Sequence, residues 1–171
     1  MKQIHLLRHA KSSWDDPDLR DFERPLAERG KTDAPRMGRF IRMIDHKPDV
    51  ICSSTAFRAK ETTQLFIEGA KMDESVIKWN EDLYFNGPSA YMECIRQTPD
   101  RFESLMLVGH NPNMEEIATR LSGGKEKVSF RMPTAALICF ETFAHKWSDV
   151  GPSTCQVKWM MIPKILNKLM D

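Results

Sequence analysis

The 171-residue chain has little of what would place it in a specialised class of proteins. Its net charge is only +1, and no long run of one sign occurs. No apolar run approaches the roughly 20 residues that span a bilayer, and the amino terminus lacks a processing pattern. We therefore expect neither nucleic-acid binding nor a membrane anchor, and we predict a cytoplasmic protein. The near-neutral charge and short chain favour a monomer.

Cysteine is scarce too, and its spacing argues against cross-links and metal sites. The four cysteines lie far apart and form no Cys-x-x-Cys pair, so the spacing predicts no zinc site. Without a signal peptide we expect reduced thiols. Cys52 and Cys139 sit in apolar runs, where cysteine behaves as a small hydrophobic residue. No trio of His, Asp and Glu has metal-ligand spacing either.

Strand-like and helix-like segments alternate along the chain. Strands are predicted at 2–8, 49–52, 76–79, 104–108, 136–142 and 154–161, the last with one exposed face, and helices at 26–45, 56–69, 88–97, 112–121 and 163–170. Pro35 is expected to kink the first helix or delay its start, and 146–153 reads as a turn. This order predicts one α/β domain over residues 1–171, with a mostly parallel central sheet flanked by helices in three layers.

Charged groups that suit a phosphoryl anion follow three of the predicted strands. Arg8 and His9 end the first strand, Arg58 follows the second and His110 follows the strand at 104–108. Ligands bind at the carboxyl edge of such sheets. The planar forks of arginine match phosphoryl oxygens, and a neutral imidazole can attack phosphorus. These four residues are the predicted catalytic group.

Three motifs carry a resemblance to a known family. They are Arg-His-Ala-Lys-Ser-Ser-Trp at 8–14, Ser-Thr-Ala-Phe-Arg-Ala at 54–59 and Gly-His-Asn-Pro at 109–112. Together they resemble the histidine phosphatase, or phosphoglycerate-mutase-like, superfamily, and the SixA-like phosphohistidine phosphatase branch in particular. Further segments similar to that branch lie at 24–30, 132–136 and 162–164.

The resemblance implies a metal-independent phosphatase that needs no cofactor and forms a phosphohistidine intermediate on His9. It also implies that a protonated His110 stabilises the phosphoryl group. Gly109 is expected to let the backbone pass close to the ligand. Lys11, Ser12, Ser13 and Asn111 are predicted substrate contacts near the mouth of the site.

A carboxylate is expected as general acid where the leaving group is an alkoxide. Glu81 is the first candidate, because it lies where the family's catalytic carboxylate often sits, and Asp82 is the second. Either residue is equally compatible with a solvated turn. An imidazole leaves more readily than an alkoxide, so a phosphohistidine substrate would tolerate a weak or absent acid. Of the other histidines, His5 is expected in the core, and His46 and His145 on the surface.

Three hypotheses of function follow. The first is a phosphatase for phosphohistidine on a partner protein, since the chain has no insertion long enough to build a lid. The second is a small-molecule phosphomonoesterase that acts on a phosphorylated metabolite with Glu81 as general acid. The third, of another class, is a non-catalytic phosphate-binding module.

Overall fold

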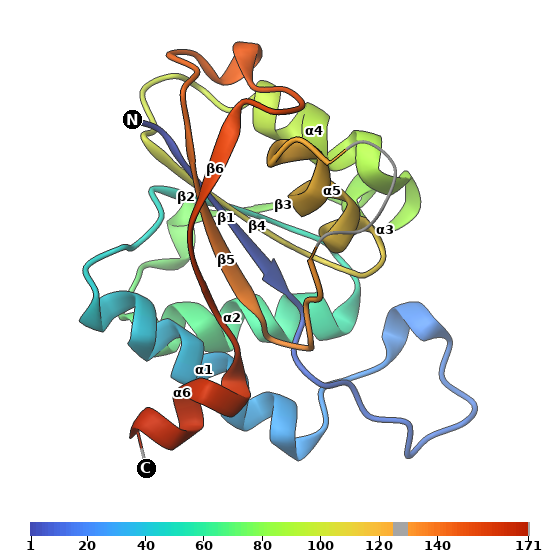
Figure 1. Cartoon of the computed structure of the whole chain (residues 1–171). Coiled ribbons are helices and arrows are strands. Elements are labelled where there is room, and N and C mark those ends of the chain that lie inside the picture. Colours follow the sequence, from blue (N-terminus) through green and yellow to red (C-terminus); the bar gives the residue numbers. More distant parts are fainter. Residues whose placement is uncertain (125–129, 171) are drawn as a thin grey trace.

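A computed structural model describes residues 1–124 and 130–170, and six of its segments form one sheet (Figure 1). The strands are β1 (Gln3–Arg8), β2 (Val50–Ser53), β3 (Ile77–Trp79), β4 (Ser104–Gly109), β5 (Leu137–Thr142) and β6 (Cys155–Met161). The helices are α1 (Glu28–Met43), α2 (Phe57–Ala70), α3 (Asp82–Phe85), α4 (Gly87–Arg96), α5 (Asn113–Leu121) and α6 (Pro163–Met170). Short 3-10 turns are η1 (Asp21–Glu23), η2 (Glu74–Val76) and η3 (Trp147–Asp149).

The sheet has a parallel part and an antiparallel edge. Its strand order is β3-β2-β4-β1-β5-β6. β3, β2, β4 and β1 pair in parallel, whereas β5 runs antiparallel to both β1 and β6. The predicted α/β class with a mostly parallel central sheet is therefore confirmed. The three parallel strands β2, β4 and β1 are neighbours, which brings their carboxyl ends to one edge.

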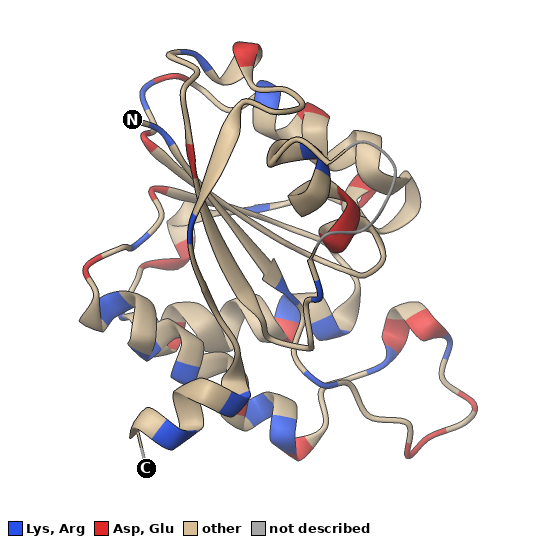
Figure 2. Cartoon of the chain, viewed as in Figure 1, with Lys and Arg blue, Asp and Glu red and all other residues tan. Residues whose placement is uncertain are grey.

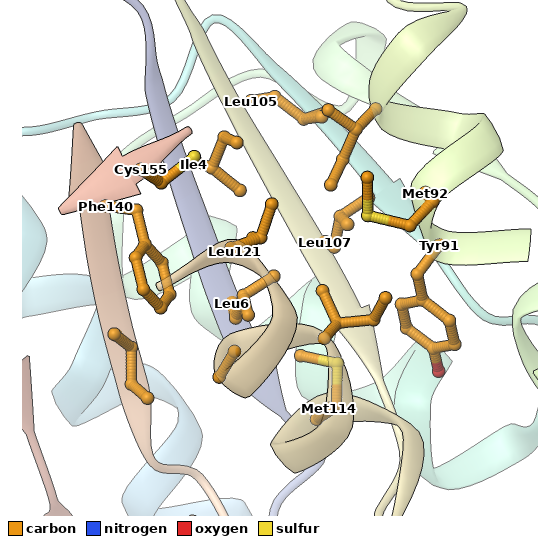
Figure 3. Close-up of a cluster of buried hydrophobic side chains, with 14 of the residues drawn as sticks. Ile4, Leu6, Tyr91, Met92, Leu105, Leu107, Met114, Leu121, Phe140 and Cys155 are labelled. Carbon is orange, nitrogen blue, oxygen red and sulfur yellow. The ribbon is translucent and has the colours of Figure 1, made fainter. Parts of the chain in front are cut away.

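Each face of the sheet has its own hydrophobic core. On one face, Ile4 and Leu6 of β1 pack with Leu107 of β4 beneath α4 and α5 (Figure 3). On the other face, Leu7 of β1 belongs to a cluster covered by α1, α2 and α6. Because successive side chains of a strand point to opposite faces, β1 is buried on both sides. That burial fixes the strand that ends in Arg8.

Close packing of α1 on α2 accounts for the course of the first helix. A Cβ at Gly38 would overlap the carbonyl of Phe66, and one at Gly69 would overlap the carbonyl of Pro35. Glycine at these two points lets the helix backbones meet. The expected delay at Pro35 is wrong, because α1 begins at Glu28 and includes Pro35 in its interior. Packing against α2 compensates for the backbone hydrogen bond that proline cannot make.

Two other expectations for the chain need correction. The segment 146–153 is more than a turn, because it contains η3 and the fully buried Trp147, whose Nε1 donates to the carbonyl of Phe102 at 2.9 Å. β6 does not alternate cleanly, since Gln156, Val157 and Lys158 are all exposed. The register shift opposite Cys139 and Phe140 breaks the two-residue period there. None of the described helices is long and apolar enough to cross a membrane.

Candidate active site

The four predicted residues lie together at the carboxyl edge of β1, β2 and β4. Arg8 is the last residue of β1 and His9 follows it; Arg58 lies in the first turn of α2, and His110 follows β4. The rings of His9 and His110 have their centroids 5.1 Å apart, and Arg58 Nε lies 3.3 Å from His9 Nε2. Three strand ends thus form one cluster of two imidazoles and two guanidinium groups.

Hydrogen bonds fix the tautomer of His9. Its Nδ1 lies 2.7 Å from the carbonyl oxygen of Ala10, which can only accept, so Nδ1 carries the proton. Nε2 then holds a free lone pair and accepts the hydrogen bond from Arg58 Nε. Burial, aided by the charges of Arg58 and Arg8, lowers the pKa of His9 to about 3. His9 is therefore a neutral imidazole at pH 7 with its lone pair directed into the cluster.

His110 is held by residues that sequence reasoning missed. Its Nε2 is 2.7 Å from Ser54 Oγ, and its backbone N–H donates to the Tyr91 hydroxyl at 3.2 Å. Its Nδ1 is buried and has no hydrogen-bond partner among the described residues. Burial, His9 and Arg58 lower the pKa of His110 to about 3. At this pKa the His110 ring is neutral at pH 7, whereas the family resemblance led us to expect a protonated ring.

Gly109 makes room for a side chain of α4, while its expected approach to a ligand stays a prediction. A Cβ at this position would overlap the hydroxyl of Tyr91. The same hydroxyl donates to the carbonyl of Leu83 at 2.8 Å and accepts from His110. Glycine is required here so that Tyr91 can fit beneath the backbone of β4, which places His110.

Arg8 is positioned from the side of α5. Its Nη1 donates to the carbonyl of Met132 at 2.8 Å, and Asn111 Nδ2 donates to the same oxygen at 3.1 Å. Glu115 accepts from Asn111 Nδ2 and from the backbone N–H of Met132, and its charge raises the pKa of Arg8 against the larger effect of burial, which lowers it. Asn111 thus lies within the site, where it supports the carbonyl that holds Arg8.

Arg58 is paired with a carboxylate that the sequence did not single out. Arg58 Nη2 lies 3.0 Å from Asp21 Oδ2, and Nη1 donates to the Asp21 carbonyl at 2.5 Å. Asp21 also accepts from the Tyr84 hydroxyl at 2.8 Å and from Arg24 Nη1 at 3.2 Å. Burial alone would raise the pKa of Asp21, but these hydrogen bonds and the charge of Arg58 lower it. Asp21 is therefore an anion that already faces Arg58.

Asp21 lies in η1, within the loop that joins β1 to α1 and extends away from the sheet in Figure 1. Acidic residues are spread along this loop (Figure 2). Nothing in the sequence distinguishes Asp21 from its acidic neighbours Asp15, Asp16 and Asp18. Only the fold of the loop over α2 brings this one carboxylate to Arg58.

The predicted contacts of the first loop are engaged elsewhere. Ser12 Oγ lies 2.9 Å from Arg24 Nη2 and Ser13 Oγ donates to Asp15 at 2.7 Å, while the side chain of Lys11 is exposed. None of the three has a hydrogen bond or ion pair to the four clustered residues. Ser12 and Ser13 instead fix the shape of the loop that carries Asp21.

Glu81 and Asp82 lie at the start of α3, and both are exposed. Asp82 Oδ1 accepts from Asn86 Nδ2, which directs it along its own helix. The Glu81 side chain has no hydrogen bond or ion pair with residues 1–124 or 130–170. The residue of α3 that reaches the cluster is Tyr84, whose ring centroid is 5.4 Å from that of His110. The acid role of Glu81 stays a prediction.

The arrangement suits a tetrahedral oxyanion. Two guanidinium groups supply fixed positive charge, and the neutral His9 ring directs a lone pair toward Arg58. The neutral His110 ring contributes a buried nitrogen that has no partner among the described residues. Within the described part of the chain, the one group of potential metal ligands lies elsewhere and contains none of these four residues.

Comparisons with known proteins agree with this geometry. The family model described as the histidine phosphatase superfamily (branch 1) matches residues 4–84, which include Arg8, His9 and Arg58. An uncharacterized chloroplastic protein of Arabidopsis thaliana is 30% identical over 177 residues, covering 95% of this chain and 78% of that protein.

Solved structures show the same fold. A crystal structure from Agrobacterium tumefaciens, of a protein with the proposed name phosphohistidine phosphatase SixA, is 28% identical with a TM-score of 0.79, covering 95% of this chain and 98% of that one. A protein histidine phosphatase SixA complexed with tungstate has a TM-score of 0.80 at 17% identity, covering 96% and 99% of the two chains. The second likeness concerns the fold alone.

Proposed function

Because the chain belongs to the histidine phosphatase superfamily, in its SixA-like branch, and is a hydrolase of phosphate esters or phosphoramidates, we propose that its substrate is phosphohistidine on a partner protein. The observation that carries the mechanism is the His9 ring. Its Nδ1 is engaged by Ala10, and its Nε2 lone pair faces Arg58.

In the first step, His9 Nε2 forms a bond to phosphorus while the N–P bond of the substrate breaks. The electron pair of that bond leaves with the substrate imidazole, which takes a proton from water. Arg8 and Arg58 hold the phosphoryl oxygens throughout. The Ser54 hydroxyl donates a hydrogen bond to His110 Nε2, so neutral His110 carries its proton on Nδ1. This N–H donates a hydrogen bond to a phosphoryl oxygen.

In the second step, water attacks the phosphorus of phospho-His9 and loses a proton to solvent. The bond to Nε2 breaks, inorganic phosphate leaves and the His9 lone pair is restored. The bound dianion replaces Asp21 as the partner of Arg58, because both are anions that fit the same guanidinium face. The pairing in the free protein keeps Arg58 oriented until substrate arrives.

The surroundings of the site support a protein substrate. Three aromatic side chains on the segments that build the site are exposed: Trp14 at 72%, Phe85 at 64% and Phe57 at 46%. Phe57 and Phe85 directly adjoin Arg58 and Tyr84, and Trp14 stacks on Arg24. Exposed aromatic groups around a polar site are typical of surfaces that contact proteins. A small phosphorylated metabolite would leave them in water.

The position of Glu81 also favours an imidazole leaving group over an alkoxide. An alkyl phosphate needs a proton donor at its leaving oxygen, and Glu81 has no hydrogen bond that would orient it toward the cluster. Asp21 is held as an anion by Arg58 and Tyr84, so it carries no proton to donate. Phosphohistidine does not depend on such a donor.

The test is a side-by-side measurement of phosphate release from a phosphohistidine protein and from an alkyl phosphomonoester. We expect faster turnover of the protein, complete loss with His9→Ala and no change with His145→Ala, since His145 is exposed. Glu81→Gln should have little effect on the protein substrate. Faster turnover of the ester, together with a large loss in Glu81→Gln, would instead establish the phosphomonoesterase.

A further inference from the structure

We propose that His5, His46 and Cys139 bind one divalent ion of the zinc class, at a site separate from the phosphatase centre. One nitrogen of each histidine and the cysteine sulfur all lie within 4.8 Å of one another. His5 and Cys139 are fully buried and His46 is half-buried. Two imidazoles and a thiol are the donor types that zinc prefers in proteins.

The sheet brings two of the three ligands together. His5 of β1 pairs directly with Cys139 of β5, and Cys139 pairs with Trp159 of β6. Residues opposite each other on neighbouring strands point to the same face. His5, Cys139 and Trp159 therefore form a row on the face covered by α1, where Trp159 packs edge-on against Phe40.

The end of α1 supplies the third ligand. Asp45 has a left-handed backbone conformation with φ of 54°, and the backbone N–H of His46 donates to the carbonyl of Ile41 at 3.1 Å. This pattern ends a helix and turns the chain back over its last residues. As a result the His46 ring lies against Trp159, with 6.1 Å between ring centroids, and so borders the row.

Unpartnered nitrogen atoms point to a ligand here. His5 Nε2 and His46 Nδ1 are both buried, and neither has a hydrogen-bond partner among the described residues. His5 Nδ1 lies 3.4 Å from Ser104 Oγ, which leaves Nε2 as the free atom. A buried polar atom without a partner is unfavourable, because it has lost its hydrogen bonds to water. Packing alone does not explain why two histidines in one cluster each have a buried nitrogen without a partner.

Coordination would satisfy all three groups. Each imidazole offers the lone pair of an unpartnered nitrogen. The Cys139 thiol loses its proton to solvent as sulfur binds the ion. Zinc bonds of about 2.0–2.3 Å require the ligand atoms to approach by about 1 Å. The half-buried His46, on its loop, provides that movement, and water supplies the fourth ligand.

The cluster is distinct from the phosphatase centre in both place and chemistry. His5 lies in the middle of β1, whereas Arg8 and His9 lie at its carboxyl end. No arginine takes part in the cluster; the nearest cation that affects His5 is Lys158, and Lys158 is paired with Glu141 at 2.6 Å. The proposal does not depend on the proposed substrate.

The experiment is a titration of chelator-treated full-length protein with Co²⁺, followed by competition with Zn²⁺. We expect one Co²⁺ per chain and a sulfur-to-cobalt charge-transfer band that Zn²⁺ abolishes. Cys139→Ser should lose the band, and His46→Gln should weaken Co²⁺ binding at least about tenfold, the loss expected when one of three protein ligands is removed. His46 is half-buried, so His46→Gln keeps the test informative if Cys139→Ser does not fold.

The matched controls are Cys155→Ser, which removes a buried thiol from β6, and His145→Gln, which removes an exposed imidazole. Both should bind Co²⁺ with the band unchanged. Absence of stoichiometric binding, or a band that survives Cys139→Ser, would overturn the proposal. Phosphatase turnover should persist after chelation, which separates this site from the reaction at His9.

Discussion

Two buried histidines, His5 within strand β1 and His9 directly after its end, have different surroundings. Burial lowers the pKa of both, to about 4 and about 3, so each ring is neutral with a lone pair. His9 is flanked by Arg8 and accepts from Arg58, whereas His5 faces His46 and Cys139. Burial is the largest cause of the lowered pKa at both sites, so it keeps each imidazole available as an electron-pair donor. The neighbouring residues determine the role of that electron pair. Beside the arginines it attacks phosphorus, and beside a second imidazole and a thiol it binds a metal ion.

The largest expected effect separates the two histidines by activity. His9→Ala removes the attacking nitrogen and should lower phosphatase turnover by at least about a thousandfold, since loss of a nucleophile removes the covalent step. His5→Gln should retain turnover within a few-fold. Phosphate release under single-turnover conditions measures both. Equal losses of turnover in the two variants would show that the two histidines do not differ in their roles.

The next largest expected effect concerns the arginines, which lie beside His9 and have no counterpart in the cluster around His5. Arg58→Lys keeps the charge but loses the planar fork, and we expect turnover to fall about 10²- to 10³-fold, as for removal of one oxyanion donor. Arg29→Lys, at an exposed position of α1, is the matched control and should have no effect. Full activity in Arg58→Lys would mean that charge alone suffices.

The histidines should also make stability depend on pH. The folded-state pKa values of His5, His9 and His110, at about 4, 3 and 3, lie below the ordinary 6.5. Between these limits the unfolded chain binds more protons than the folded protein. The free energy of unfolding should therefore fall as pH decreases from about 6.5 toward 3, by about 1.4 kcal/mol per ring and pH unit.

Denaturant unfolding between about pH 6.5 and pH 4 measures this slope. His110→Asn should remove the share of one ring, while His145→Gln, at an exposed position, should leave the slope unchanged. Inorganic phosphate should reduce the contribution of His9 and His110, because a bound anion raises the pKa values of both rings. A free energy of unfolding that stays constant across this range would show that burial does not lower the pKa values of these rings.

The smallest effect tests the anion that Arg58 already binds. Asp21→Asn removes the negative charge beside Arg58, and we expect inhibition by inorganic phosphate to become about two- to fivefold stronger, the scale of an ion pair whose carboxylate is partly exposed to solvent. The difference should shrink at high salt. Weaker phosphate inhibition in Asp21→Asn would show that Asp21 mainly orients Arg58.

Much of the fold could be predicted because its signals are local. Apolar runs fix the strands, and the residues that follow them, such as Arg8 and His110, need only the rule that parallel strand ends meet. The expected delay of the helix start at Pro35 was wrong, because the packing that tolerates this proline depends on Gly69, which is distant in sequence. α3 and η1 were missed, since each is under five residues and carries no periodic pattern.

The site was predicted less completely than the fold. The four clustered residues were found, but Asp21, Tyr84 and Glu115 act through hydrogen bonds between segments far apart in sequence, which no spacing reveals. Ser54 lies within a quoted motif, but its contact with His110 is also long-range and was missed. The same limit explains the ligand cluster. His46 was expected on the surface, and no linear pattern joins it to His5 and Cys139; strand register and the left-handed turn at Asp45 bring them together.

The central claim is that His9 accepts the phosphoryl group from a phosphohistidine protein. The most direct test is rapid quenching of the enzyme with a substrate protein labelled on phosphohistidine, followed by mapping of the label. We predict an acid-labile, base-stable label on His9 that accumulates before free phosphate appears and is absent in His9→Ala. Release of phosphate without label on His9, or label transfer that survives His9→Ala, would contradict the account.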